Sequence, residues 1–245
     1  MRRFARVASI VGLYLFGAAL LHADDAGLPK LIIYGDSAVP KESPDGAFLP
    51  TRKTRDMVEA FLVHTGIEHE FAMLPWPRAL REVEESDNGL IFALLRMPDR
   101  EARFHWILPL TEAGPMRLYA RKNATPVGFS QDTVELLLST AACEKAAAQC
   151  VVLREFGFPR DRILLVPEAR DGAVEQMVLR GRADFMAGFD DAVAGNLARL
   201  GYAPDALVPV ADLSNVPDYL AAPKMLDTRL LERLQEAVKT FQPPE

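Results

Sequence analysis

The sequence has few residues of the types that hold metals or build disulfide frameworks. Among its 245 residues are two cysteines and four histidines. It contains no HExxH or CxxC motif, and no Cys/His cluster has the spacing of a zinc site. The motifs GxGxxG and GxSxG and the P-loop are also absent. We therefore expect no metal, no cofactor and no catalytic residues.

An excess of positive charge is lacking as well. The chain has 28 Lys and Arg against 34 Asp and Glu, for a formal net charge of −6. Such a balance argues against a dedicated nucleic-acid-binding protein, which normally has a basic face. Hydrophobic residues make up 49% and charged residues 25%, the composition of an ordinary globular protein. That composition excludes disordered chains and polytopic membrane proteins.

The amino terminus has the pattern of a secretory signal peptide. Arg2, Arg3 and Arg6 precede an apolar run over residues 10–21, and Ala23 offers a small residue for cleavage. The run is shorter than the roughly 20 residues that a membrane span needs. We expect a mature chain of 245 − 23 = 222 residues with a net charge of 25 − 34 = −9. The alternative interpretation is an uncleaved membrane anchor.

The two cysteines, Cys143 and Cys150, lie seven positions apart in a segment that the sequence predicts to be helical, residues 142–156. Seven residues of helix span about 10.5 Å, whereas the Cα atoms of a disulfide lie within about 7 Å. A disulfide therefore forms only if Cys143 precedes the helix or lies in a distorted first turn. The sequence leaves both states of the pair open.

Hydrophobic patterning predicts two successive α/β units. The first alternates short apolar strands with amphipathic helices, which is typical of a parallel sheet. Its predicted strands are residues 31–34, 71–74 and 90–95, and its helices are 54–65 and 77–85. The second unit has predicted strands at 116–121, 134–138, 163–166 and 183–187, and helices at 142–156, 171–179 and 192–200. An extended segment at 219–221 and an amphipathic helix at 228–241 end the chain.

Several segments give the sequence a family resemblance. The motif Met97-Pro98-Asp99-Arg100 is followed by an aromatic pair and a proline at Phe104, Trp106 and Pro109. Further segments in the same order are PWPRAL at 75–80, LREFGFP at 153–159, LRGRAD at 179–184 and YLAAPK at 219–224. Together they resemble the amino-acid-type periplasmic solute-binding proteins, the extracellular solute-binding protein family 3. The resemblance covers essentially all of the mature chain.

The resemblance implies an α/β fold of two lobes, the type II periplasmic binding fold. Each lobe would be a mostly parallel sheet flanked by helices. The first lobe would comprise residues 24–120 together with the returning segment 217–245, and the second lobe would comprise residues 121–216. Two hinge strands, 116–121 and 219–222, would connect them, and a ligand would bind between the lobes. We expect a monomer.

The resemblance also implies ligand-binding residues in the first lobe. Arg100 matches the arginine that binds the ligand carboxylate, and a guanidinium offers two parallel donors to such a group. Arg96, at the end of an apolar strand, and Trp76 and Arg78, which follow the preceding strand, are further candidates. Each has an ordinary alternative: a surface arginine in a charged loop, or a tryptophan packed in the lobe.

Candidates in the second lobe follow two predicted strands. Ser139 and Thr140 would start a helix and offer hydroxyl and N–H donors to an anion, or would simply cap that helix. Asp190 and Asp191 follow a strand at the place where relatives hold the ligand's ammonium group. Their alternative role is that of a helix N-cap. The sequence does not distinguish the two aspartates.

The function predicted on this basis is that of a non-catalytic periplasmic solute-binding protein. It would capture a small carboxylate-bearing ligand, an amino acid or a related molecule, for a membrane permease of an ABC transport system. Met97 stands where the family has Thr, and an Ala-Leu-Leu segment replaces a Ser-rich strand at 93–95, so neutral polar partners of an amino acid are fewer. The alternatives are an enzyme on the same fold, resembling a cyclohexadienyl dehydratase, and a ligand-sensing subunit of a membrane receptor kinase.

Overall fold

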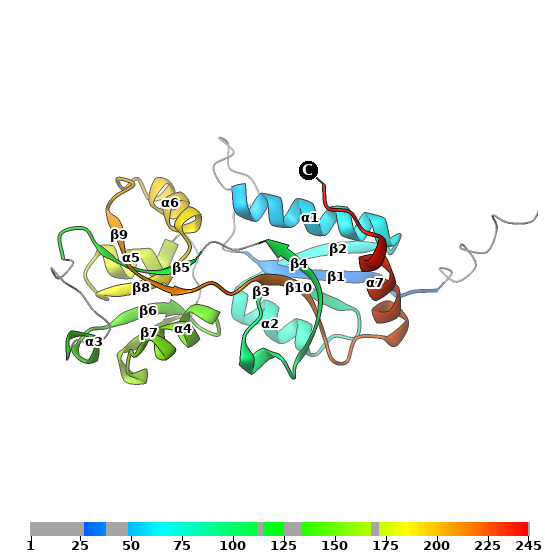
Figure 1. Cartoon of the computed structure of the whole chain (residues 1–245), viewed down its shortest axis with the longest axis horizontal. Helices are drawn as coiled ribbons and strands as arrows, with labels where there is room; N and C mark the ends of the chain where they lie inside the picture. Colours follow the sequence, from blue (N-terminus) through cyan, green and yellow to red (C-terminus); the bar gives the residue numbers. More distant parts are fainter. Residues whose placement is uncertain (1–26, 38–48, 112–114, 125–133, 168–171, 245) are drawn as a thin grey trace, which may run out of the picture.

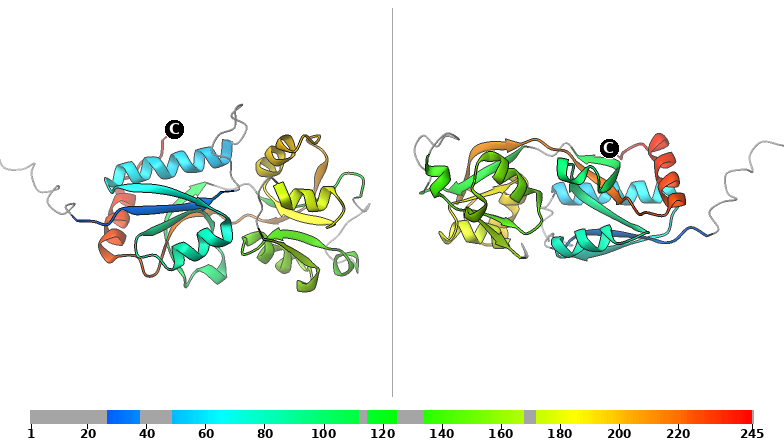
Figure 2. Two further views of the ribbon diagram at one scale, coloured as in Figure 1. Left: turned by 180° about the vertical axis from the view of Figure 1, so that it is seen from behind. Right: turned by 90° about the horizontal axis from the view of Figure 1, so that it is seen from below.

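The computed structural model describes residues 27–37, 49–111, 115–124, 134–167 and 172–244. The predicted signal peptide, with its cleavage site after Ala23, lies outside the described residues. The chain folds into two lobes, each built on a five-stranded sheet. Figure 1 shows the lobes next to each other along the long axis of the molecule, and the two views of Figure 2 show the same separation from behind and from below.

The sheet of the first lobe has the strand order β2-β1-β3-β10-β4. Strands β1, β2 and β3 pair in parallel, whereas β10 runs antiparallel to both β3 and β4. A strand from the end of the chain therefore lies inside a sheet made by its beginning. The bounds are β1 Leu31–Asp36, β2 His69–Leu74, β3 Gly89–Leu95, β4 Phe104–Thr111 and β10 Asp218–Pro223.

The sheet of the second lobe has the order β7-β6-β8-β5-β9. Here β6, β7 and β8 are parallel, and β5 runs antiparallel to β8 and β9. The predicted lobe boundary after residue 120 falls inside β5, which hydrogen-bonds along its length in the second sheet. The bounds are β5 Met116–Arg121, β6 Ala141–Glu144, β7 Ile163–Val166, β8 Phe185–Gly188 and β9 Leu207–Ser214.

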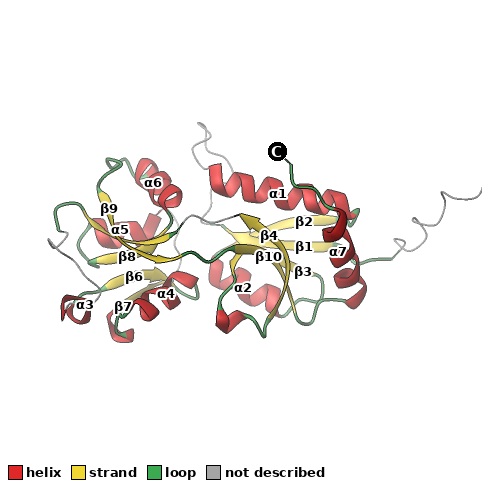
Figure 3. Ribbon diagram, viewed as in Figure 1, coloured by secondary structure: helices red, strands yellow, loops and turns green. Residues whose placement is uncertain are grey.

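Helices cover both faces of each sheet, as Figure 3 shows. In the first lobe α1 (Leu49–Thr65) and α7 (Thr228–Thr240) pack on one face and α2 (Trp76–Glu84) on the other. In the second lobe α3 (Val134–Leu138) and α4 (Ala148–Phe156) pack on one face, and α5 (Ala173–Leu179) and α6 (Asp190–Arg199) on the other. Short 3₁₀ turns, η1 (Pro98–Arg100) and η2 (Arg160–Arg162), complete the described elements. The predicted two-lobed α/β architecture is confirmed.

The apolar run predicted as the third strand, residues 90–95, lies in β3. Its residues are buried with one exception, Ala93, whose φ is 57°. The pairing of β10 with β3 shifts register between Tyr219 and Ala221, next to this residue. An L-residue with positive φ is typical of such local irregularities.

Two predicted elements of the second lobe are wrong. Residues 134–138 form the helix α3 instead of a strand, and Leu137 and Leu138 are 57% and 66% exposed. A short apolar run does not distinguish a strand from a helix by periodicity. The helix predicted over 142–156 begins only at Ala148, because Ala141–Glu144 form the buried strand β6.

The sequence also did not predict β4 and β9 as strands. Both are edge strands, and each contains a proline, Pro109 and Pro209 respectively. Proline cannot donate to a strand ladder, so it weakens the strand pattern in the sequence and is tolerated in a sheet mainly at an edge.

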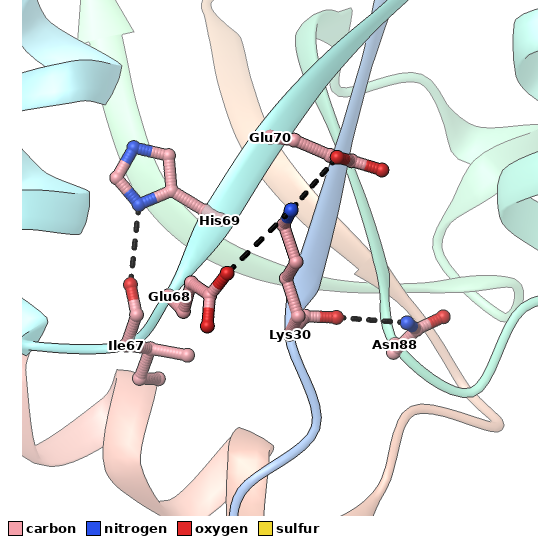
Figure 4. A network of polar contacts seen from close by, with 6 residues as sticks. All are labelled: Lys30, Ile67, Glu68, His69, Glu70 and Asn88. Carbon is pink, nitrogen blue, oxygen red and sulfur yellow. Dashed lines mark hydrogen bonds and ion pairs between the residues drawn. The ribbon is translucent and has the colours of Figure 1, made fainter.

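A polar network ties the amino ends of β1 and β2 together (Figure 4). Lys30 Nζ lies 2.8 Å from a carboxylate oxygen of Glu70 and 3.6 Å from one of Glu68. Asn88 Nδ2, just before β3, donates to the Lys30 carbonyl at 2.8 Å. The network lies at the outer end of the sheet. The opposite end, where the parallel strands terminate, faces the second lobe.

The core contact of α7 gives a test of the discontinuous first lobe. Leu234 is fully buried against the first sheet, so Leu234→Ala should lower the free energy of unfolding by about 2–5 kcal/mol. Chemical denaturation followed by circular dichroism measures it. The control Val63→Ala changes a side chain that is 67% exposed on α1 and should cost less than about 0.5 kcal/mol. Equal effects of the two substitutions would contradict the packing of α7 in this core.

Candidate functional site

The carboxyl end of β3 places a buried cation between the lobes. Met97 is extended, Pro98 starts the 3₁₀ turn η1, and the turn brings Arg100 back over the end of the strand. Arg100 is 3% exposed, and its guanidinium donates to the Leu95 carbonyl at 3.1 Å. The turn thus fixes the guanidinium at the edge of the first sheet that faces the second lobe.

The second lobe presents the turn that follows β6. This strand ends at Glu144, and α4 begins at Ala148. Cys143 and Cys150 form a disulfide across the turn, with Cα atoms 5.5 Å apart. The sequence did not decide whether this disulfide forms. It required that Cys143 precede the helix or lie in a distorted first turn. Because Cys143 lies in β6 rather than in a helix, the distance is short enough.

One carbonyl of that turn accepts hydrogen bonds from two side chains of the other lobe. Trp76 Nε1 and an Arg100 guanidinium nitrogen each donate to the Ala146 carbonyl at 3.3 Å. Ala147 is buried in the same apolar cluster as Trp76. Ala146 itself has a φ of 65°, in the left-handed region. Two of the predicted site residues, Arg100 and Trp76, therefore meet at a point that the sequence did not identify.

The charge of Arg100 is incompletely compensated. No carboxylate among the described residues forms an ion pair with it, and its guanidinium donates to two carbonyl oxygens. Burial lowers the pKa of this guanidinium, while the nearby acid Asp99 acts in the opposite direction. An arginine nevertheless remains protonated in proteins. A buried cation held only by carbonyl dipoles is a favourable place for an anion.

A buried hydroxyl with no partner among the described residues lies at the end of β1. The Ser37 hydroxyl is buried and has no hydrogen-bond partner among the described residues. The Ser37 amide donates to the Leu74 carbonyl at 2.8 Å, which places this residue at the carboxyl ends of β1 and β2. Buried hydroxyls are normally hydrogen-bonded, so this edge of the first sheet has unused capacity for a polar ligand.

Asp190 starts α6 at the carboxyl end of β8, with its carboxylate turned to β5. Arg117 donates to it at 2.7 Å and also to Asp212 at 3.0 Å, and the Tyr119 hydroxyl donates to its other oxygen. Burial and the Asp190 carboxylate raise the pKa of Tyr119. Asp191, the next residue, is exposed as Asp190 is. The two aspartates are distinguished by their contacts, because Asp190 is the one that binds Arg117 and the Tyr119 hydroxyl.

The remaining predicted site residues are placed elsewhere. Arg96 forms a two-point ion pair with Glu101, at 2.7 and 3.2 Å, and its guanidinium lies 5.4 Å from the ring centroid of Trp106. Arg78 is exposed on α2 and pairs with Glu82 at 3.3 Å. Their ion-pair partners, Glu101 and Glu82, are thus different from the carbonyl acceptors of Arg100.

Ser139 and Thr140 do not start a helix, because β6 follows them. They lie at the amino end of this strand, opposite to the Ala146 turn. The Thr140 amide and hydroxyl both donate to the Asp184 carboxylate at 2.8 Å, joining the starts of β6 and β8. The interpretation of this pair as donors at a helix start is therefore wrong. The segment that occupies the corresponding place, 144–147, was missed because the preceding apolar run was taken for the strand.

Comparison with known proteins places this geometry in a structural class. No protein-family model matches the chain, and no curated protein matches it. Solved structures do match. A histidine kinase sensor domain with similarity to periplasmic binding proteins superposes with a TM-score of 0.67 at 15% identity, over 86% of this chain and 89% of that one. The chain has the fold of the periplasmic binding proteins.

Other structures with this fold agree. The arginine-bound substrate-binding protein AbpA of Streptococcus pneumoniae matches with a TM-score of 0.64 at 15% identity, covering 86% of this chain and 88% of that one. The GluR0 ligand-binding core of Nostoc punctiforme, in complex with L-glutamate, gives 0.62 at 15% identity, covering 86% and 91%. Identities this low establish the periplasmic-binding-protein fold alone.

Among the described residues, no group of three or more His, Cys, Asp or Glu side chains is arranged to hold a metal ion. No helix in the described part is both long and apolar enough to cross a membrane.

The strained backbone at Ala146 predicts an unusual response to glycine. An L-residue pays about 1–2 kcal/mol in the left-handed region, whereas glycine does not. Ala146→Gly should therefore leave the free energy of unfolding unchanged or raise it by up to about 1 kcal/mol. The control Ala147→Gly removes a buried methyl at a residue with a φ of −76° and should lower it by about 1 kcal/mol. Urea titration of both variants measures their free energies of unfolding. A greater loss of stability for Ala146→Gly than for Ala147→Gly would contradict the left-handed turn.

Proposed function

We propose that this chain is a solute-binding protein that holds a small carboxylate-bearing ligand, an amino acid or a related acid, between its two lobes. The observation that carries the proposal is the buried Arg100. Its guanidinium faces the second lobe and forms no ion pair with a carboxylate of the described residues. Burial of a charge is costly unless the charge is paired and hydrogen-bonded. A ligand carboxylate supplies that pairing with two parallel hydrogen bonds.

The surroundings of Arg100 suit a ligand clamped from both sides. Trp76 offers an aromatic wall, the Ser37 hydroxyl has no partner among the described residues, and the Ala146 turn of the second lobe lies against both Trp76 and Arg100. Two-lobed proteins of this kind close on a ligand by a hinge motion. Here the chain crosses between the sheets twice, from β4 to β5 and from β9 to β10.

The other predicted ligand residues have secondary roles in this proposal. Asp190, held by Arg117 and Tyr119, lies at the cleft-facing edge of the second sheet and is the better placed of the two aspartates for a ligand's cationic group. Arg96, already neutralised by Glu101, is expected to shape the site rather than to bind the ligand.

Export and delivery complete the proposal. A cleaved signal peptide would bring the monomeric protein to the periplasm, and the Cys143–Cys150 disulfide suits such an oxidising compartment. The ligand would then pass to a membrane permease. The match to a histidine kinase sensor domain supports the alternative of a sensing role, in which the closed lobes act on a membrane kinase. Co-purification with a permease complex or with a kinase distinguishes these partners.

Calorimetry against a panel that includes L-arginine, L-glutamate, glutarate and succinate tests the site. We expect at least one carboxylate to bind and Arg100→Met to weaken that binding by about 2–5 kcal/mol, about 30-fold to several thousand-fold in Kd. The loss follows because the ligand's carboxylate would be desolvated without a partner.

Arg103→Met is the matched control. Arg103 follows the same 3₁₀ turn, is exposed and pairs with Glu84, so its removal should leave the Kd within about twofold. Full affinity after Arg100→Met would refute the assigned carboxylate partner, and failure of every carboxylate to bind the unmodified protein would refute the function. Turnover of prephenate or arogenate would instead favour the dehydratase-like enzyme.

A further inference from the structure

The disulfide encloses the part of the second lobe that contacts Arg100 and Trp76. Cys143 is the third residue of β6 and Cys150 lies in the first turn of α4, so the bridge spans the segment 144–149. Within this segment the Ala146 carbonyl accepts both hydrogen bonds from the first lobe. The bridge and the cross-lobe contact thus belong to one small closed loop.

The loop has a conformation that its own sequence does not favour. Ala146 has a φ of 65°, and such a conformation costs a non-glycine residue about 1–2 kcal/mol. Three backbone hydrogen bonds of 2.8–3.1 Å hold the turn, from Lys145 to Val166, from Ala147 to Glu144 and from Cys150 to Ala147. A disulfide across the turn reduces the number of other backbone conformations that Ala146 could adopt.

We propose that Cys143 and Cys150 are positioning residues of the binding site: their disulfide holds the Ala146 carbonyl against Trp76 and Arg100, so that reduction of the bond loosens the cross-lobe contact and weakens ligand capture. The claim that reduction weakens ligand capture rests on the function proposed above. The claim that the disulfide holds the Ala146 turn in place rests on the geometry alone. The bond would make the affinity of the site depend on the redox state of its surroundings.

The reductive step is an ordinary thiol–disulfide exchange with a dithiol. Cys143 is 1% exposed whereas Cys150 is half-buried, so the attacking thiolate reaches the Cys150 sulfur. The S–S bond breaks, Cys143 leaves as a thiolate and takes up a proton, and the second thiol of the reagent displaces Cys150. Two protein thiols form, and the dithiol is oxidised to its cyclic disulfide.

The chain allows a clean experiment, because it has two cysteines and two tryptophans. In a Trp106→Phe background, Trp76 is the sole tryptophan and reports on the Ala146 contact. Trp76 is 8% exposed. Reduction with dithiothreitol, verified by a count of two thiols, should raise acrylamide quenching of its fluorescence at least about twofold, with the far-UV circular dichroism retained. Cys143→Ala/Cys150→Ala should reproduce the rise.

The matched control is the Trp76→Phe protein, in which Trp106 reports from β4, beside Arg96 and Tyr219. Its quenching should not change on reduction. Unchanged Trp76 quenching in protein with two free thiols would overturn the proposal, as would an equal rise for Trp106, which would indicate general unfolding.

Ligand titration then separates this inference from the proposed function. The panel carboxylate that binds the oxidised protein should bind the reduced protein about tenfold more weakly, and equal affinity would remove the disulfide from the binding role. If no carboxylate binds the oxidised protein but Trp76 quenching still rises on reduction, the proposed function fails while the positioning of the turn stands.

Discussion

The position of β10 is the constraint on which the rest of this structure depends. This strand comes from the end of the chain and lies antiparallel between β3 and β4. Its residues Leu220, Ala221 and Ala222 are fully buried, so the first sheet has no continuous core without it. Because the chain must leave the first lobe after β4 and return at β10, everything between them forms a separate lobe joined by two crossings.

This topology sets the two halves of the candidate site against each other. Parallel strands end at one edge of each sheet, and side chains beyond those ends gather there. Arg100 follows β3 in the first lobe, and Ala146 follows β6 in the second. Arg100 has one acceptor within its own lobe, the Leu95 carbonyl, whereas the Ala146 carbonyl accepts its two side-chain hydrogen bonds from the other lobe. One hydrogen bond joins Arg100 to the Ala146 carbonyl, and the guanidinium forms no ion pair with a carboxylate of the described residues.

The candidate site was predictable where local sequence carries chemistry. Arg100 was identified from the motif around Met97-Pro98-Asp99, and it lies buried at the edge that faces the other lobe. Arg96 was a candidate because it ends an apolar strand, but in the structure it forms an ion pair with Glu101, a contact that the sequence does not reveal. Thr140 was predicted to follow a strand over residues 134–138 and to precede a helix, but that segment is the helix α3, so Thr140 lies at the start of β6 instead.

The sequence by itself determined the fold class and most of the element order. Alternating apolar strands and amphipathic helices have distinct periods, and those periods are local properties. It could not show that the proline-containing segments β4 and β9 are strands, because a proline is tolerated mainly in an edge strand. It also could not decide whether Cys143 and Cys150 form a disulfide. Only the tertiary structure decided these points, and only it brought Trp76, Arg100 and the Ala146 carbonyl together. Burial, strand order and left-handed backbone depend on contacts between segments that lie far apart in the sequence, such as the pairing of β10 with β3 and β4, and no local pattern encodes such contacts.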